Sequence, residues 1–170
     1  LLNVVPSSVL AVSIFTNNIT VALFALVVGI FYGLGTAYII GMNGLMLGAV
    51  FSYTAQHGLA ARLFEFVVAH GFVEISVIMV AGACGMSLGE ALARPGREAR
   101  VQAFQRASMR AARLMVVCCA FLVGAGLIEG YVSPNPAYSM PIRLCVGLGY
   151  LALFVIVLSG ALGRLPRPRD

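Results

Sequence analysis

Charged residues are scarce in this sequence, and the first part of the chain has none. Only 10% of the 170 residues are charged, whereas 61% are hydrophobic. A soluble domain carries about 25% charged residues. No Asp, Glu, Lys or Arg occurs from Leu1 to Ala61. Bilayer-spanning segments are selected against charge, so the composition excludes an ordinary soluble domain and predicts an integral membrane protein.

The chain also lacks lysine and the common catalytic motifs. Its eleven basic residues are all arginine, and with six acidic residues they give a net charge of +5. The arginines flank apolar segments, which indicates contact with lipid headgroups rather than with nucleic acid. No HExxH, P-loop or Gly-x-Ser-x-Gly motif is present. We therefore expect no enzymatic activity, no metal and no cofactor.

Apolar runs of membrane-spanning length recur along the chain. A transmembrane helix needs about 20 apolar residues, within a range of about 17–25. The sequence predicts five hydrophobic helices, at 19–41, 44–58, 63–88, 114–132 and 142–162, of which the second is short enough to be re-entrant. An uncharged segment, 1–18, precedes this bundle of 19–162, and a basic tail, 163–170, follows it. The start without Met predicts a fragment. The predicted fold class is an all-α polytopic transmembrane helix bundle.

Two connections carry distinctive signals. Gly41-Met-Asn43-Gly44 is a turn signal, so we expect a helix break at Asn43 and Gly44. The Arg-rich connection 90–113 contains the helix-breaking pair Pro95-Gly96, and an interfacial amphipathic helix or a solvated loop helix then follows. Its arginines are candidate headgroup ligands or cytoplasmic anchors: Arg97, Arg100, Arg106, Arg110 and Arg113.

The arginine distribution also predicts sidedness. The connection 90–113 and the tail are separated by two predicted spans, so both can lie in the cytoplasm. The loop at Pro134 then faces outward. If 44–58 spans the membrane, the segment 1–18 lies outside as well.

Glycines recur at four-residue spacing, which places both members of a pair on one helix face. Such pairs let helix backbones approach closely in lipid. We predict that these glycines face other helices, either within the chain or between copies of it. The pairs are Gly29/Gly33, Gly44/Gly48, Gly85/Gly89 and Gly126/Gly130.

A few polar residues interrupt the apolar segments. A carboxylate in a spanning segment is costly unless it has a partner. His70 and Glu74 are four residues apart and share a helix face. In the orientation with 44–58 spanning the membrane, which we prefer, these two residues lie at a similar depth to Asn17, Asn18 and Glu129. The sequence therefore predicts one polar cluster, either a structural clasp or a functional site.

The order and spacing of these motifs resemble the stage II sporulation protein M family. The resemblance rests on Phe15-Thr-Asn17-Asn18-Ile19, Asn43-Gly44-x-x-x-Gly48, His70-Gly71-x-x-Glu74 and Gly126-Leu-Ile128-Glu129-Gly130-Tyr131-Val132-Ser133-Pro134. It covers about Phe15 to Gly160. The member that gives the family its name is a polytopic scaffold in spore-forming bacteria, where it gathers peptidoglycan-degrading partners at the septal membrane. The resemblance therefore implies a scaffold role.

The resemblance thus favours a multi-pass scaffold or assembly protein in a prokaryotic cytoplasmic membrane. Its expected partners are membrane lipid and other membrane or cell-envelope proteins, and association into a homo-oligomer is a further alternative. The alternative is a channel or permease subunit with a polar site between helices 63–88 and 114–132. A scaffold should close the polar cluster with internal hydrogen bonds, whereas a transporter should connect it to water.

Overall fold

The described part of the chain is a bundle of helices and contains no strand. The computed structural model describes residues 7–163, and the predicted tail beyond Gly163 and residues 1–6 lie outside this range. The elements are α1 (Ser7–Val27), the 3-10 helix η1 (Val28–Ile30), α2 (Leu34–Gln56), α3 (Ala60–Val67), α4 (Gly71–Ala93), α5 (Arg100–Tyr131) and α6 (Met140–Gly163). The predicted all-α fold class is confirmed.

Within residues 7–163, four helices are long and apolar enough to cross a membrane, namely α2, α4, α5 and α6. A shorter apolar helical stretch, Phe15–Ile30, adds a fifth hydrophobic element. Helix α2 has 23 residues, which at about 1.5 Å per residue matches a hydrocarbon core of about 30 Å. The count of about five hydrophobic helices therefore agrees with the prediction, and the second of them is full-length rather than re-entrant.

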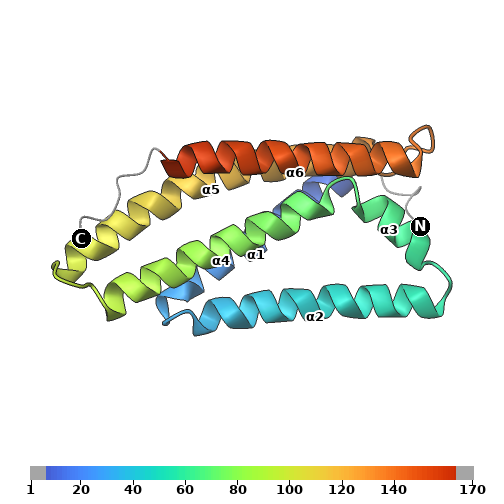
Figure 1. Ribbon diagram of the computed structural model, residues 1–170. Coiled ribbons are helices and arrows are strands. Elements are labelled where there is room, and N and C mark those ends of the chain that lie inside the picture. Colours follow the sequence, from blue (N-terminus) through green and yellow to red (C-terminus); the bar gives the residue numbers. More distant parts are fainter. Residues whose placement is uncertain (1–6, 164–170) are drawn as a thin grey trace.

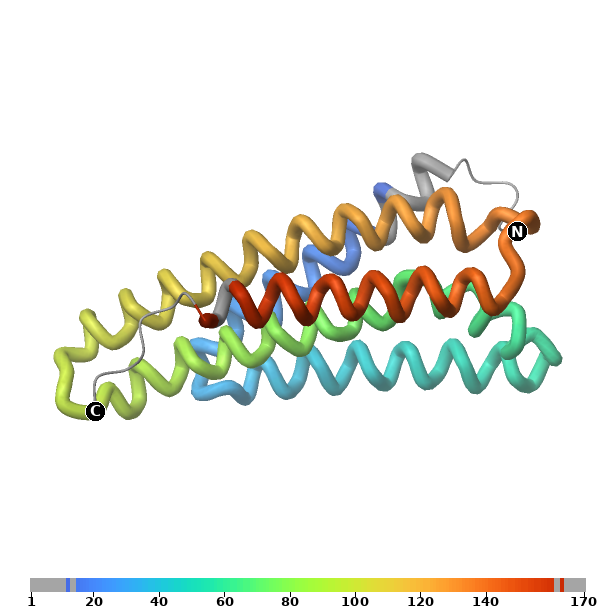
Figure 2. Tube along the Cα trace, turned by 45° about the horizontal axis from the view of Figure 1, so that its top comes forward, coloured from blue at the N-terminus to red at the C-terminus, as the bar shows by residue number. Residues whose placement is uncertain are grey.

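The long helices lie side by side along one axis (Figure 1). Helix α2 occupies one edge of the bundle and α5 the opposite edge, with α4 and α1 between them (Figure 2). At one end α4 begins, α5 ends and α6 begins, next to the short helix α3. The α4–α5 connection and η1 lie at the other end. The two ends therefore carry different loops, and the arginine-rich connection belongs to only one of them.

The predicted break at Asn43 and Gly44 is wrong, because both residues lie inside α2. The chain turns earlier, after η1, where Tyr32 and Gly33 have φ values of 55° and 78°. Glycine adopts positive φ without steric cost, which suits Gly33 to this turn. An unbroken α2 satisfies its own backbone hydrogen bonds in lipid, where an exposed turn could not. The predicted helix 19–41 is consequently two helices, and α1 begins at Ser7, within the predicted segment 1–18.

Two further boundaries differ from the prediction. The segment 63–88 is divided between α3 and α4, with a turn at Val68–His70. The arginine-rich stretch is not a separate interfacial helix, because α5 runs without interruption from Arg100 to Tyr131. Pro95 and Gly96 end the preceding helix rather than dividing α5, and Gly96 has a φ of 68°. The helix interior from Arg100 to Tyr131 contains no proline that would stop it.

The bundle core is apolar and tightly packed around α4 and α5. Its buried members include Val77, Leu122 and Phe154, which are at most 1% exposed. The backbones of η1 and α4 approach closely, because a Cβ on Gly29 would collide with the backbone of Gly85. A Cβ on Gly89 would likewise collide with the carbonyl oxygen of Gly29. These three glycines therefore hold the end of the first hydrophobic element against α4.

Candidate functional site

Three titratable side chains converge inside the bundle near the end formed by α3. His70 directly precedes α4, Glu74 lies one turn into it, and Glu129 lies near the end of α5. The Nε2 atom of His70 is 3.7 Å from Oε1 of Glu129 and 4.0 Å from Oε2 of Glu74. Exposures of 3% for His70, 9% for Glu74 and 2% for Glu129 show that the three side chains are shielded. We call these three residues the His–Glu cluster.

The histidine ring is oriented by a residue of the loop after α5. Nδ1 of His70 lies 3.0 Å from Oγ of Ser133, and Ser133 is only 2% exposed. This contact occupies one ring nitrogen and leaves Nε2 facing the two carboxyl groups. Phe66 packs against the ring edge-on, with the centroids 5.7 Å apart. The ring position is thus set from both α3 and the α5–α6 loop.

Helix α1 contributes Asn18, whose side chain interacts with the carboxyl group of Glu74. Within residues 7–163, Oε1 of Glu74 and Oε2 of Glu129 are nevertheless buried without a hydrogen-bond partner. A buried polar atom without a partner costs about 1–3 kcal/mol, and more when it is charged. The cluster is therefore well shielded but not fully satisfied by the described protein groups.

Sequence reasoning missed two residues that shape this end of the bundle. Ser133 appeared in the sequence only at the end of the family motif 126–134, and no contact was predicted for it. Arg143 donates a 2.9 Å hydrogen bond to the carbonyl oxygen of Asn135 and a 3.4 Å one to that of Glu65. It therefore links α6, the preceding loop and α3. Its only sequence signal was its position as a lone charge at the edge of an apolar segment.

Some predicted residues lie outside the cluster. Asn17 is exposed, one position from the buried Asn18, because neighbouring helix positions point about 100° apart. Asn43 lies within α2, half-buried, and is no part of a turn. Gly33 belongs to the α1–α2 turn, although the side chain of Met86 packs on it.

The predicted packing glycines divide into two groups. Gly29, Gly85, Gly89, Gly126 and Gly130 are all buried. Gly44 and Gly48 are exposed, and a Cβ on either would meet nothing within 4 Å. This second pair therefore packs against nothing within the described chain, and the predicted packing between copies stays a prediction.

The arginine-rich end lies far from the His–Glu cluster. Glu74 and Arg94 are separated by most of α4, about 30 Å at 1.5 Å per residue. The candidate headgroup ligands are exposed there, namely Arg97, Arg100, Arg106, Arg110 and Arg113. Arg106 forms an ion pair with Glu98, close to the start of α5. The positions suit contact with headgroups at one membrane face.

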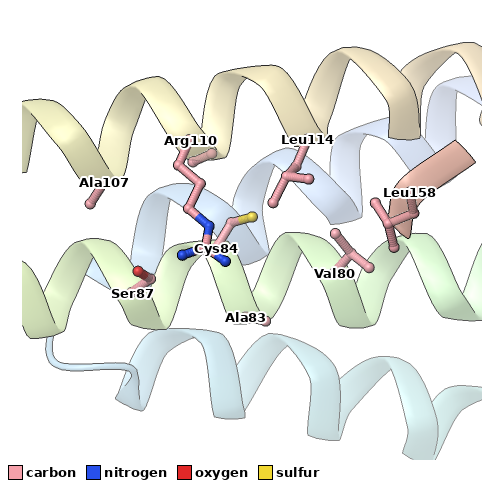
Figure 3. A pocket seen from close by; sticks show the side chains of 9 residues that line it. Val80, Ala83, Cys84, Ser87, Ala107, Arg110, Leu114 and Leu158 are labelled. Atoms are coloured by element: carbon pink, nitrogen blue, oxygen red, sulfur yellow. The ribbon is translucent and has the colours of Figure 1, made fainter. Parts of the chain in front are cut away.

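A pocket of about 300 Å³ opens between α4, α5 and α6 toward this arginine-rich end. Figure 3 shows the side chain of Arg110 reaching from α5 toward Cys84 on α4. Leu114 and Leu158 form apolar parts of the lining. The pocket is separate from the His–Glu cluster, with which it shares no residue.

Apolar helices of bilayer length, packed around one buried polar cluster, define a polytopic helical membrane protein. A family model described as stage II sporulation protein M matches residues 3–134. The chain therefore belongs to the stage II sporulation protein M family, as its motifs predicted. The matched range contains His70, Glu74, Glu129 and Ser133, whereas α6 lies beyond it. No curated protein and no solved structure matches the chain significantly.

Proposed function

We infer that this protein is a non-catalytic scaffold of a prokaryotic cytoplasmic membrane, which binds transmembrane helices of other cell-envelope proteins. The observation that carries this function is the position of α2. This helix is long enough to span the membrane, yet only 6% of its apolar window is buried inside the protein. A spanning helix at the edge of a bundle offers a whole side to a partner.

One face of α2 consists of small residues. Ala37, Gly41, Gly44, Gly48, Ser52 and Ala55 follow one another at three- and four-residue spacing, and all are exposed. A Cβ on Gly41, Gly44 or Gly48 would meet nothing within 4 Å. Small residues at this spacing let a second helix backbone approach closely, which favours helix association in lipid. We call these six residues the small-residue face of α2.

The most buried contacts of the same helix lie near its beginning. Thr36 is fully buried, and its hydroxyl group donates a 2.7 Å hydrogen bond to the carbonyl oxygen of Ala25. The side chain of Ile40 lies against Gly82 of α4. The small-residue face is next to the side of α2 that contacts the bundle, and it remains exposed. A partner helix could therefore bind α2 without displacing any packing of the bundle.

Site-directed crosslinking tests the scaffold function. Gly44→Cys, in a variant without native cysteines, would carry a thiol-linked photocrosslinker in the membranes of the native host. We expect a covalent adduct with another envelope protein, identified by mass spectrometry. Gly149→Cys on α6 is the matched control, because Gly149 is also exposed with nothing within 4 Å.

The outcomes separate the alternatives. An adduct formed equally from position 149 would indicate random encounter in the membrane. An adduct with a second copy of this chain would indicate that the small-residue face mediates homo-oligomerisation and does not bind another envelope protein. When Gly44→Leu lowers recovery of the crosslinked partner but not the thermal stability of the purified chain, the small-residue face is the binding surface.

The alternative function, a channel or permease subunit, draws on a different observation. Two buried carboxyl oxygens lack partners among the described residues, and polar groups within a membrane often line ion pathways. Proteoliposomes that contain the purified chain alone would distinguish the two functions. Proton or cation flux that disappears in Glu129→Gln would favour transport, whereas tight vesicles would favour the scaffold.

A further inference from the structure

The His–Glu cluster has the donors of a metal site. One ligand atom from each of His70, Glu74 and Glu129 can be chosen so that all three lie within 4.8 Å of one another. A tetrahedral ion with bonds of about 2.0–2.2 Å separates its ligands by roughly 3.3–3.6 Å. The distances from His70 Nε2, 3.7 Å and 4.0 Å, are slightly longer. Small rotations of the three side chains would close them on one ion.

The unpaired oxygens point to a missing ligand. Glu129 is 2% exposed, and its Oε2 atom has no hydrogen-bond partner among the described residues. The same holds for Oε1 of Glu74, from the neighbouring helix. Native proteins rarely leave such atoms buried without a partner. A cation between the two carboxyl groups would occupy acceptor capacity that the described protein groups leave open.

The histidine is held as metal-binding histidines usually are. Such a residue donates its second ring N–H to an oxygen, which fixes the ring and the tautomer. Oγ of Ser133 lies 3.0 Å from Nδ1 of His70 and can accept this hydrogen bond. The Nε2 lone pair then faces the carboxyl groups. The outer contact needed for a metal ligand is therefore already present.

Charge supports the same assignment. Two ionised carboxylates so deep in a membrane protein would repel each other and lack hydration. A divalent cation balances both charges, and the site as a whole becomes neutral. Imidazole nitrogen together with carboxylate oxygen is a donor set typical of Zn²⁺. We propose that His70, Glu74 and Glu129 bind a divalent metal ion, with Zn²⁺ the best match to the three donors.

The sequence predicted these residues as one polar cluster but not as a metal site, because it lacks an HExxH motif. His70 and Glu74 are close in sequence, but the third ligand comes from α5, and Ser133 comes from the loop that follows. The site joins the beginning of α4 to the end of α5. Metal binding there would also tie together helices that belong to distant parts of the chain.

Zinc binding by the purified chain tests the proposal. The full chain in detergent is stripped with a chelator and titrated with Zn²⁺ alone, by calorimetry and elemental analysis. We expect saturable, stoichiometric binding and a melting temperature that rises with Zn²⁺ concentration, because a ligand that binds the folded state stabilises it. Co²⁺ in the same site should show visible ligand-field absorption, which reports the donor geometry directly.

Matched variants locate the ion. Glu129→Gln and His70→Gln should abolish stoichiometric binding and the Co²⁺ spectrum. His57→Gln and Glu65→Gln change the other histidine and a nearby acid outside the cluster, and both should bind as the parent does. Ser133→Ala keeps every ligand and should weaken binding about 10- to 100-fold, as is usual for partners of metal-bound histidine.

Two results would overturn the proposal. The first is the absence of stoichiometric Zn²⁺ binding by the folded parent chain, which would leave protons or water as the occupants of the cluster. The second is Zn²⁺ binding that is unchanged in each of the two single variants, Ser133→Ala and Glu129→Gln, which would place the ion elsewhere. If Glu129→Gln does not fold, Ser133→Ala and the Co²⁺ spectrum still decide the matter.

Discussion

The hydroxyl group of Thr36 on α2 donates a 2.7 Å hydrogen bond to the carbonyl oxygen of Ala25 on α1. Thr36 is 0% exposed, and this bond crosses the turn that reverses the chain. It joins two helices that sequence analysis treated as one. The pair therefore marks where the first hydrophobic segment folds back on itself.

Removing this hydroxyl group should loosen α2. Thr36→Val keeps the side-chain shape but deletes the donor, at a cost of about 0.5–1.5 kcal/mol for one intramolecular hydrogen bond. Thermal unfolding in detergent should show a lower midpoint. Thr54→Val is the matched control on the same helix, because Thr54 bonds only to carbonyl oxygens of its own helix. Equal losses from the two variants would contradict a special role for Thr36.

Glycine substitutions should divide according to their surroundings. A Cβ on Gly85 would lie 2.6 Å and 2.7 Å from the carbonyl oxygens of Ala25 and Leu26, which are backbone atoms. Gly85→Leu should therefore lower stability by about 1–3 kcal/mol or prevent folding, as overpacking does. Gly149→Leu should be tolerated, because Gly149 has open space around it. Expression level and melting temperature in detergent check both variants, and tolerance of Gly85→Leu would contradict close packing of the end of α1 on α4.

Substitutions at Glu129 should rank by their capacity for hydrogen bonding. The carboxyl group faces Nε2 of His70 at 3.7 Å. Glu129→Gln can still offer an amide to this nitrogen, whereas Glu129→Leu leaves it without a partner, at a cost of about 1–3 kcal/mol. We expect Glu129→Leu to unfold at the lower temperature. Measuring both variants after chelation separates this comparison from metal binding, and the reverse order would mean that the carboxyl group gives no stabilising contact.

The two ends of the bundle should face opposite sides of the membrane. Ala99 directly precedes α5, and Ala137 lies in the loop after it; both are exposed. In a variant without native cysteines, Ala99→Cys should react with a membrane-impermeant thiol reagent only after the cells are opened. Ala137→Cys should react in intact cells, because arginine-rich connections stay in the cytoplasm. Reaction of both positions from the same side would refute this orientation.

The membrane character and the cluster residues were predictable because both follow from the solvent that each residue meets. A segment without charge identifies lipid as its surroundings, wherever its neighbours are. A carboxylate such as Glu129 cannot face lipid tails cheaply, so it must point inward. Together with the four-residue spacing of His70 and Glu74 and the predicted membrane orientation, this rule predicted that these two residues and Glu129 form one cluster. It could not supply Ser133, whose hydroxyl group becomes important only when the loop folds back onto His70.

The sequence by itself thus determined that this protein is a helical membrane bundle of the stage II sporulation protein M family, with polar residues directed inward. Only the tertiary structure decided where the helices break and which glycines are packed. Gly41, Asn43 and Gly44 looked like a turn, but the turn forms at Tyr32 and Gly33. The physical reason is that the position of a turn and a close backbone contact both depend on two chain segments that pack together, not on one segment alone. Gly29 is a packing residue because Gly85 lies against it, whereas Gly48 has the same local sequence pattern but a Cβ on it would meet nothing within 4 Å.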